Sequence, residues 1–365
     1  MLKYYTKNLH HIFQEEKLTM KQEIELILLS VLRNKTEEEI SRITELINSD
    51  LNWVYIGGIL INHRLSGYFI NGLNNEQAVK VPKELLKTLK LLIKAQVERQ
   101  ALINKEIDII DKKLRQTDIR FAGLKGVLLG TEVYVNGDRR SNDVDLLVYE
   151  EDLDKLDKAM REMGYIQSNC PNSELIEASK KEKIIQRMNY HDLVPYVKQI
   201  DDIVLEVDIN FLFDGKDNQI DKQVYEDGLF VYYGNAYSIT GLSQRMNLAF
   251  FIVHFYREAT NSIWTNEKRD IVFYKIVDTM NYIRHVQNKI DRNELVEVFK
   301  KLNIAGKAYY VFNVLREFYN NEFITNMLSL LDEFKNNDLG NIYIVEQKKY
   351  IKRENSFFDS VFCEL

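Results

Sequence analysis

The spacing of hydrophobic and polar positions divides the chain into two helical end regions and a central region with both strand and helix patterns. Before residue 115, apolar residues recur with helical spacing, as in residues 19–33, and Thr36 with Glu39 has the pattern of a capping box. Pro82 opens a long segment of helical spacing that reaches about Leu114. The helical spacing returns after residue 242, where polar breaks separate predicted helices at residues 243–258, 267–286, 291–302, 308–319 and 324–334.

The mixed middle of the chain begins with a short apolar run at residues 119–124. The run ends at Lys125 and Gly126, and residues 127–134 then have helical spacing. This order predicts a strand, a tight glycine turn and a helix whose first backbone N–H groups are free. Free N–H groups at the positive end of a helix are suited to holding phosphate.

Two carboxylates mark the next predicted strand. Asp143 and Asp145 lie two positions apart in a run that becomes fully apolar, so their side chains point to the same face of the strand. Such a pair also occurs by chance on strands that face solvent. If the strand is buried, the two carboxylates repel each other and lose hydration, which favours a bound cation. Mg²⁺ is the natural candidate because it takes oxygen ligands, whereas Zn²⁺ prefers nearby His or Cys.

Two more strands are predicted at residues 188–198 and 203–213, and the second of them is acidic on one face. In it, apolar residues alternate with Glu206, Asp208 and Asn210. One face of this strand is therefore expected to join the core, and the other face to present the carboxylates.

The composition is that of an ordinary globular protein of 365 residues, with 45% hydrophobic and 28% charged residues. A formal net charge of −6 argues against strong non-specific nucleic-acid binding, which needs a concentrated basic face. Cys170 and Cys363 are expected to be reduced thiols rather than a disulfide. The N-terminus lacks the apolar segment of a signal peptide, and no apolar run approaches the roughly 18 residues of a membrane span. We therefore expect a cytoplasmic protein without a membrane partner.

The motifs in the middle of the chain carry a resemblance to a known family. A strand ending in glycine, a helix and a strand with two aspartates are similar to the core of the polymerase-β-type nucleotidyltransferase superfamily. More narrowly, the sequence resembles the bacterial family of uncharacterised nucleotidyltransferases. The resemblance rests on Leu-Lys-Gly at residues 124–126, a helix ending in tyrosine, and then Arg139, Asp143 and Asp145 in the family's spacing.

The resemblance also implies roles for residues outside this motif. It places the third acidic metal ligand at Glu206, with Asp208 second because it stands where the family has a histidine, and it matches His191 to a histidine on the preceding strand. The implied site has Asp143, Asp145 and Glu206 as catalytic residues, Asp143, Asp145, Glu206 and Asp208 as metal ligands, and Lys125, Gly126, Arg139 and His191 as nucleotide-binding residues.

The implied reaction is transfer of a nucleoside monophosphate from an NTP, ATP included, to an acceptor hydroxyl or phosphate, with release of pyrophosphate. The implied cofactor is Mg²⁺, as two ions, with Mn²⁺ as a substitute. The acceptor is left open as a small molecule, a peptide or a protein, and so is the oligomeric state. Two alternatives stand beside this reading: a non-catalytic nucleotide-binding regulator or peptide-tailoring partner that uses the same cleft, and an interaction protein that acts through its helical bundle.

The expected fold is α+β. A small mixed β-sheet nucleotidyltransferase core at residues 116–240 is flanked by an N-terminal helical region at residues 1–115 and by a C-terminal helical bundle and tail at residues 241–365. His63 is interpreted as a packed core histidine rather than a ligand. His254 and Asp278 resemble family positions, although such residues more often make structural hydrogen bonds. The tail at residues 348–362 either stays loose or docks its aromatic side chains.

Overall fold

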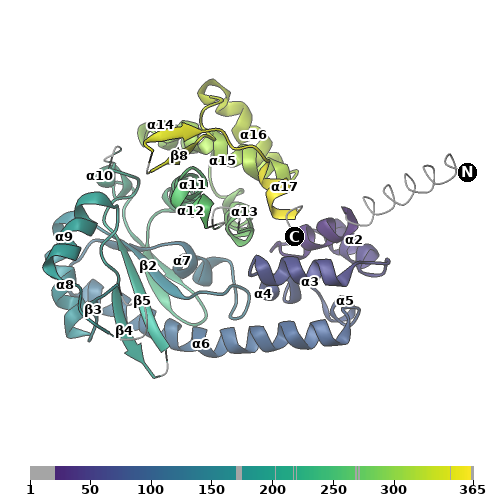
Figure 1. Cartoon of the computed structure of the whole chain (residues 1–365), viewed down its shortest axis with the longest axis horizontal. Helices are drawn as coiled ribbons and strands as arrows, with labels where there is room; N and C mark the ends of the chain where they lie inside the picture. The colour runs from purple at the N-terminus through teal and green to yellow at the C-terminus, as the bar shows by residue number, and fades with distance from the viewer. Residues whose placement is uncertain are drawn as a thin grey trace, which may run out of the picture.

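The computed structural model describes residues 21–169, 175–201, 203–216, 218, 220–267, 269, 272–345 and 347–362. Within these ranges the chain has the predicted α+β class, with many helices around a small mixed sheet (Figure 1). The expectations for Cys170, Cys363 and the N-terminal segment at residues 1–20 concern positions outside the described residues.

Helices make up the N-terminal part of the described chain. Residues 21–30 are helical, and the predicted capping box is present, because the backbone N–H of Glu39 donates to Thr36 Oγ1 at 3.2 Å. The apolar segment around His63 forms two helices rather than one, joined by a turn in which Arg64 has a φ of +59°. The helices with printed bounds in Figure 1 are α2 (Glu37–Ile47), α3 (Trp53–Asn62), α4 (Ser66–Ile70), α5 (Asn75–Ala78) and the predicted long helix α6 (Lys83–Gln116).

The central sheet has five strands in the order β1-β2-β5-β4-β3. Strand β2 runs parallel to β5, and the other neighbouring pairs are antiparallel, so the sheet is mixed as predicted. The two strands that carry the acidic residues are therefore direct neighbours at its centre. The strands are β1 (Phe121–Gly123), β2 (Asp143–Val148), β3 (Ile166–Gln167), β4 (Tyr196–Ile200) and β5 (Ile203–Asn210).

Helices and a hairpin surround this sheet. The predicted strand, turn and helix order is confirmed by β1 and α7 (Lys125–Glu132), and Gly164, with a φ of +85°, ends the turn that follows α8. The hairpin of β6 and β7 packs on β1 and α7 and was not predicted. The elements are η1 (Glu150–Asp152), α8 (Leu153–Glu162), α9 (Lys180–Asn189), α10 (Asp221–Val224), β6 (Phe230–Tyr233) and β7 (Ser238–Gly241).

The strand predicted at residues 188–198 is wrong in its first half. Helix α9 continues to Asn189, and β4 begins only at Tyr196. The residues between them bend, and the backbone carbonyl of His191 accepts N–H groups from Phe211 and Leu212. Pro195 has no N–H to donate to a strand ladder, which fits a strand that starts after it. His191 therefore lies in a bend and not on a strand.

Helices dominate again after the hairpin. The helix predicted at residues 267–286 is shorter than expected, because α12 ends at Asn266 and α13 begins only at Tyr274. A two-stranded sheet of β8 and β9 was not predicted. The elements are α11 (Gln244–Ala259), α12 (Ser262–Asn266), α13 (Tyr274–Val286), α14 (Arg292–Lys301), α15 (Ala305–Phe318), α16 (Glu322–Leu330), η2 (Asp332–Phe334), β8 (Ile342–Ile344), β9 (Lys349–Ile351) and α17 (Phe357–Phe362).

The C-terminal tail docks through its aromatic side chains. Phe357 and Phe362 of α17 are buried, and Phe362 lies edge-on to Phe273 with ring centroids 5.4 Å apart. His63 ties this contact to the N-terminal helices: its Nε2 lies 3.2 Å from the carbonyl oxygen of Val361, and its Nδ1 accepts the N–H of Phe273 at 3.1 Å. Burial lowers the pKa of His63 to about 4, so the interpretation of His63 as a packed core histidine is confirmed.

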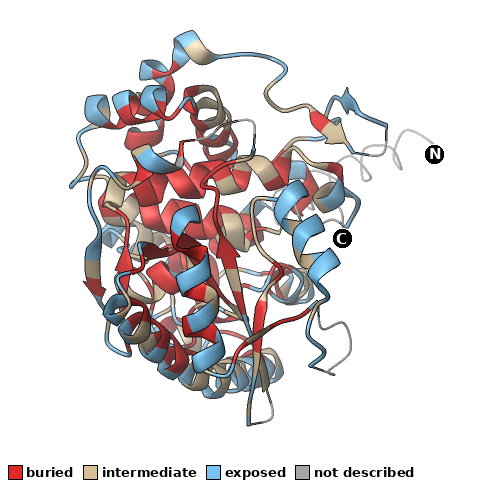
Figure 2. Ribbon diagram, turned by 90° about the vertical axis from the view of Figure 1, so that its left-hand side faces the viewer, coloured by how far each residue is buried: buried red, intermediate tan, exposed pale blue. Residues whose placement is uncertain are grey.

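One cluster of buried hydrophobic residues runs from the N-terminal helices through the sheet to α17. Figure 2 shows this buried interior in red behind a shell of exposed helix faces. The predicted region boundaries after residues 115 and 240 each fall one residue before an element ends, at α6 and at β7. In the described ranges, none of the helices is both long and apolar enough to span a membrane.

Candidate functional site

Four carboxylates gather on one face of the sheet. In the parallel pair of β2 and β5, Asp143 lies opposite Glu206 and Asp145 lies opposite Asp208. Side chains two apart on a strand share a face, and directly paired residues of neighbouring strands do so too. All four line the same cleft, which has a volume of about 450 Å³. We call Asp143, Asp145, Glu206 and Asp208 the acidic wall of this cleft.

The acidic wall is electrostatically strained. Burial raises the pKa of Asp208 to about 8, and the neighbouring charges of Asp145 and Glu206 add to the rise. Burial likewise raises the pKa of Asp145, and burial with the charge of Asp143 raises that of Glu206. Carboxylates that lose hydration and face like charges favour a proton or a cation. The arrangement is thus suited to binding positive charge.

Lys125 is the cation that the structure places against this wall. Its Nζ donates to Asp145 Oδ1 at 2.7 Å, and both side chains are largely buried. Burial alone would lower the pKa of Lys125, but the charges of Asp145, Glu258 and Asp143 and the hydrogen bond to Asp145 together outweigh it, and the pKa is raised. Among the described residues, no three His, Cys, Asp or Glu side chains converge as a ready-made metal site.

Arg139 is held by a carboxylate from the C-terminal helices. Its Nε donates to Asp278 Oδ2 at 2.8 Å, while Tyr68 and Tyr134 donate their hydroxyls to Asp278 Oδ1 at 2.7 and 2.9 Å. Asp278 is 4% exposed, so its charge is balanced almost entirely by these partners. Helices α4 and α13 and the segment after α7 are joined at this single side chain.

Gly126 is required by the packing of Arg139 as well as by the turn. A Cβ at this position would lie 2.4 Å from Arg139 Nη1 and 2.9 Å from Ser141 Oγ, and these two groups are themselves hydrogen-bonded at 2.6 Å. The space that the sequence assigned to an approaching phosphate is thus occupied by the guanidinium on that side. Helix α7 still begins without a side-chain cap, since Leu124 offers no acceptor.

The opposite side of the cleft carries cations and aromatic rings that the sequence motifs did not reveal. We call Arg64, Trp264, Arg269, Tyr274 and Lys275 the cationic wall. Arg64 lies 5.7 Å from the ring centroid of Tyr274, and Arg269 and Lys275 lie 4.7 and 5.5 Å from that of Trp264. These contacts fall in the range of cation–π attraction. The wall is assembled from the turn after α3, from α12 and from the start of α13.

Helix α11 also lines the cleft. His254 and Glu258 lie one turn apart on this helix, with Nε2 and Oε2 3.6 Å apart, and Glu258 Oε2 also pairs with Lys275 Nζ at 2.5 Å. Burial lowers the pKa of His254 well below its usual value, so this histidine is neutral at pH 7. Two polar residues that are four positions apart in a largely apolar helical segment form a pattern from which both could have been predicted to line a cleft. The aromatic residues Phe251 and Phe255 line the cleft from the same helix and are also part of the buried core.

His191 lies near this site without lining the cleft. Burial and the neighbouring charges of Arg257 and Lys125 lower its pKa to about 2, so it is neutral. Its Nε2 is 3.7 Å from Asp192 Oδ2. Of the residues singled out from the sequence, the structure therefore brings the acidic wall, Lys125, Arg139, His254 and Asp278 into the lining of one cleft, whereas His191 and Gly126 do not line it.

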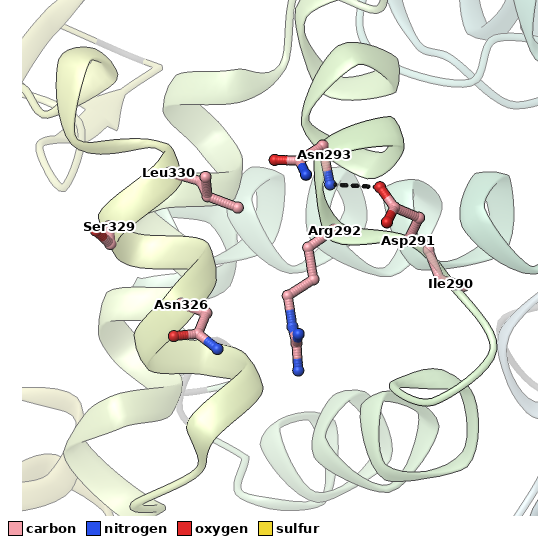
Figure 3. Close-up of a pocket in the computed structure, with 7 residues that line it drawn as sticks. All are labelled: Ile290, Asp291, Arg292, Asn293, Asn326, Ser329 and Leu330. Carbon is pink, nitrogen blue, oxygen red and sulfur yellow. Dashed lines mark hydrogen bonds between the residues drawn. The ribbon is translucent and has the colours of Figure 1, made fainter.

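A second hollow, at the start of α14, has different chemistry (Figure 3). Its lining includes Arg292, Asn326 and Leu330. The N-terminus of α14 is already satisfied, because Asp291 Oδ1 accepts the backbone N–H groups of Asn293 and Glu294 at 2.9 and 3.0 Å. Nothing there matches the concentration of charge in the cleft above the sheet.

A comparison with protein families identifies the class of protein. The chain belongs to the family described as uncharacterised nucleotidyltransferase, whose model matches residues 49–320. This match spans both walls of the cleft. A search of curated proteins finds no match. Among solved structures, an antigenic nucleotidyltransferase-like protein from Paracoccidioides brasiliensis is similar over 54% of this chain and 92% of its own, with 10% identity and a TM-score of 0.25.

Proposed function

We propose that this protein is a metal-dependent nucleotidyltransferase that moves a nucleoside monophosphate from an NTP to an acceptor hydroxyl or phosphate. The observation that carries the proposal is the acidic wall: paired carboxylates on adjacent strands face a cleft that also holds cations, in a chain of a nucleotidyltransferase family. Carboxylates on one side and cations on the other suit a metal-bound triphosphate.

The donor set of the acidic wall fits Mg²⁺, and Mn²⁺ as a substitute. Only carboxylate oxygens are offered, and burial has raised the pKa values of Asp145, Glu206 and Asp208, so a hard cation relieves their repulsion. Asp143 and Asp145 would hold the metal with Glu206, and Asp208 is the alternative third ligand. When bound, a divalent cation stabilises charge on the phosphate oxygens and lowers the pKa of a coordinated hydroxyl.

The other side chains of the cleft are positioned to bind and orient the triphosphate. Among the described residues, Arg64 has no ion-pair partner and Arg140 only an Asn142 contact, so both line the cleft with charge to offer. The uncapped start of α7 adds backbone N–H groups. The acceptor oxygen then attacks the α-phosphorus, a hydroxyl acceptor releases its proton to solvent, and the bond between the α and β phosphates breaks to release pyrophosphate.

The test is to incubate the protein with each NTP and Mg²⁺, with and without a pool of metabolites and peptides, and to measure pyrophosphate. The expected result is acceptor-dependent pyrophosphate that disappears in Asp143→Asn. Tight, metal-dependent NTP binding without pyrophosphate under every condition would instead support the non-catalytic regulator. Absence of metal-dependent NTP binding would overturn both proposals.

A further inference from the structure

Lys125 neutralises only one member of the acidic wall. Its Nζ contacts Asp145 Oδ1 at 2.7 Å, whereas Asp143, Glu206 and Asp208 have no Lys or Arg within ion-pair distance among the described residues. One ammonium thus faces four carboxylates lining the same cleft. The single positive charge of Lys125 is too small to balance the acidic wall. Its ammonium also contacts an oxygen of Asp145, which is a proposed metal ligand.

The backbone delivers Lys125 to this position. Strand β1 pairs antiparallel with β2, which places Gly123 opposite Leu146, and the N–H of Leu124 donates to the carbonyl of Asp145 at 3.0 Å. Lys125 itself has a φ of +45°, a left-handed conformation that non-glycine residues adopt rarely. This turn aims the lysine stem along β2 rather than away from the sheet. The contact is therefore built into the connection between β1 and α7.

A lysine side chain in such a contact can be exchanged for another cation. Its ammonium is a mobile point charge on a flexible stem, and the Lys125 side chain keeps 20% exposure in the cleft, so it has a path away from Asp145. Asp145, at 6% side-chain exposure, cannot be left without a cation partner at low cost. A divalent cation at the wall could replace the ammonium and also balance the carboxylates that Lys125 does not reach.

We propose that Lys125 is a displaceable counter-ion that competes with the divalent cation for Asp145 and is freed toward the triphosphate when the metal binds. This inference rests on the proposed function, because it takes the acidic wall as the metal site. It makes the nucleotide-free enzyme a weak metal binder. It also couples metal binding to NTP binding through one side chain, since the freed ammonium becomes available to phosphate.

The test measures Mn²⁺ binding without nucleotide, by calorimetry or by the loss of the free-ion paramagnetic resonance signal, on the full chain. Lys125→Gln removes the charge and keeps a hydrogen-bond donor for Asp145, so it preserves folding better than an apolar replacement. Lys275→Gln is the matched control, because it removes a cation of the same cleft that pairs with Glu258 rather than with the acidic wall. Asp143→Asn reports whether Mn²⁺ binds at the wall at all.

The expected result is Mn²⁺ binding about tenfold tighter in Lys125→Gln than in the wild type, a typical size for a coupling between two ligands of one site. Lys275→Gln should stay within about twofold of the wild type. If Lys125→Gln binds Mn²⁺ no more tightly than the wild type while Asp143→Asn binds it more weakly, the competition is overturned but the metal site stands. Mn²⁺ binding by none of the proteins, or unchanged binding by Asp143→Asn, would overturn the metal site and with it the proposed function.

If Lys125→Gln does not fold, Lys125→Arg replaces it. The bidentate guanidinium of arginine should hold Asp145 more strongly than the ammonium and so weaken Mn²⁺ binding. Mn²⁺ binding equal to that of the wild type would contradict the competition.

Discussion

The two walls of the cleft are built in different ways. The acidic wall comes from two neighbouring parallel strands, whose pairing fixes the position of every carboxylate. The cationic wall comes from a left-handed turn after α3, from α12 and from the start of α13, and helices rather than a ladder of hydrogen bonds hold it. A sheet sets the spacing of its side chains by its own geometry, whereas the second wall depends on tertiary packing throughout.

This difference predicts that the two walls respond differently to substitution. Changes in the acidic wall should affect chemistry and metal binding more than folding. Changes beneath the cationic wall should affect folding, and changes on its surface should affect nucleotide affinity alone. The predictions below test this contrast in order of expected effect.

The largest effect is expected at Asp143. Asp143→Asn should lower the rate of transfer by about 10²- to 10³-fold or more, the scale for loss of one group that stabilises transition-state charge. Folding should be unchanged or improved, because one repelling charge is removed from the wall. Asp145→Asn should lose activity too, but it should also destabilise the protein, since Lys125 loses its partner. Chemical denaturation measures the stability of both variants, and a turnover assay measures their transfer rates. Normal turnover by Asp143→Asn would show that Asp143 is not part of the active site.

The second prediction concerns the anchor of Arg139. Asp278→Asn should destabilise the protein by about 3 kcal/mol, because it leaves a buried guanidinium without its carboxylate. The asparagine keeps one acceptor oxygen for the hydroxyls of Tyr68 and Tyr134, so the loss falls mainly on Arg139. Urea unfolding measures the change, and Asp50→Asn on the surface is the control, with no change expected. A loss in Asp278→Asn as small as that in the control would mean that Arg139 is not held in this way.

The third prediction is a dependence of stability on pH. His63 has a pKa lowered to about 4 in the folded protein against about 6.5 when unfolded, so the unfolded state binds its proton first as the pH falls. Its contribution to stability is complete above pH 6.5 and is lost as the pH falls toward 4, for a total of about 3 kcal/mol. His63→Gln should reduce the acid sensitivity of the unfolding free energy over this window by about that amount. Because His63 accepts the N–H of Phe273, next to Tyr274, acid should loosen the cationic wall first. Identical pH profiles for the two proteins would contradict this.

The smallest effect is expected on the exposed surface of the cationic wall. Arg64→Ala should weaken NTP binding by about three- to tenfold, the net scale of one hydrogen bond at a solvent-exposed position, and should leave the unfolding midpoint unchanged. Arg316→Ala, an exposed arginine on α15, is the matched control. Titration of an NTP with Mg²⁺ into both variants measures the effect. Equal affinities would show that Arg64 does not reach the nucleotide.

The sequence predicted what local periodicity determines. Asp143 could be placed with Asp145, and Glu206 with Asp208, because strand alternation is a property of neighbouring residues, and the structure confirms the shared face of each pair. The capping box at Thr36 and the long helix followed from equally local signals, whereas the mixed sheet was expected from the family resemblance. The catalytic and metal-binding roles of these residues stay predictions.

The sequence could not predict what long-range packing determines. Arg64 and Trp264 are about two hundred positions apart and carry no shared periodicity, so their meeting in one cleft follows only from the docking of α3 and α4 near α12 and α13. The resemblance assigns Lys125 to nucleotide binding, and this role stays a prediction. The contact of Lys125 with Asp145 follows from the antiparallel pairing of β1 with β2, which the local pattern does not specify. The bend at His191 was missed because the end of a helix and a proline were interpreted as one strand.

The central claim is that the bond broken in the NTP lies between its α and β phosphates. The direct measurement supplies NTP labelled with ³²P at either the α or the γ position, together with Mg²⁺ and a cell extract as the source of acceptor, and compares wild type with Asp143→Asn. The account predicts that the α label passes to an acceptor, that the γ label leaves as pyrophosphate, and that Asp143→Asn does neither. Transfer of the γ label to an acceptor, or an α label that stays in NTP while wild type binds it, would contradict the account.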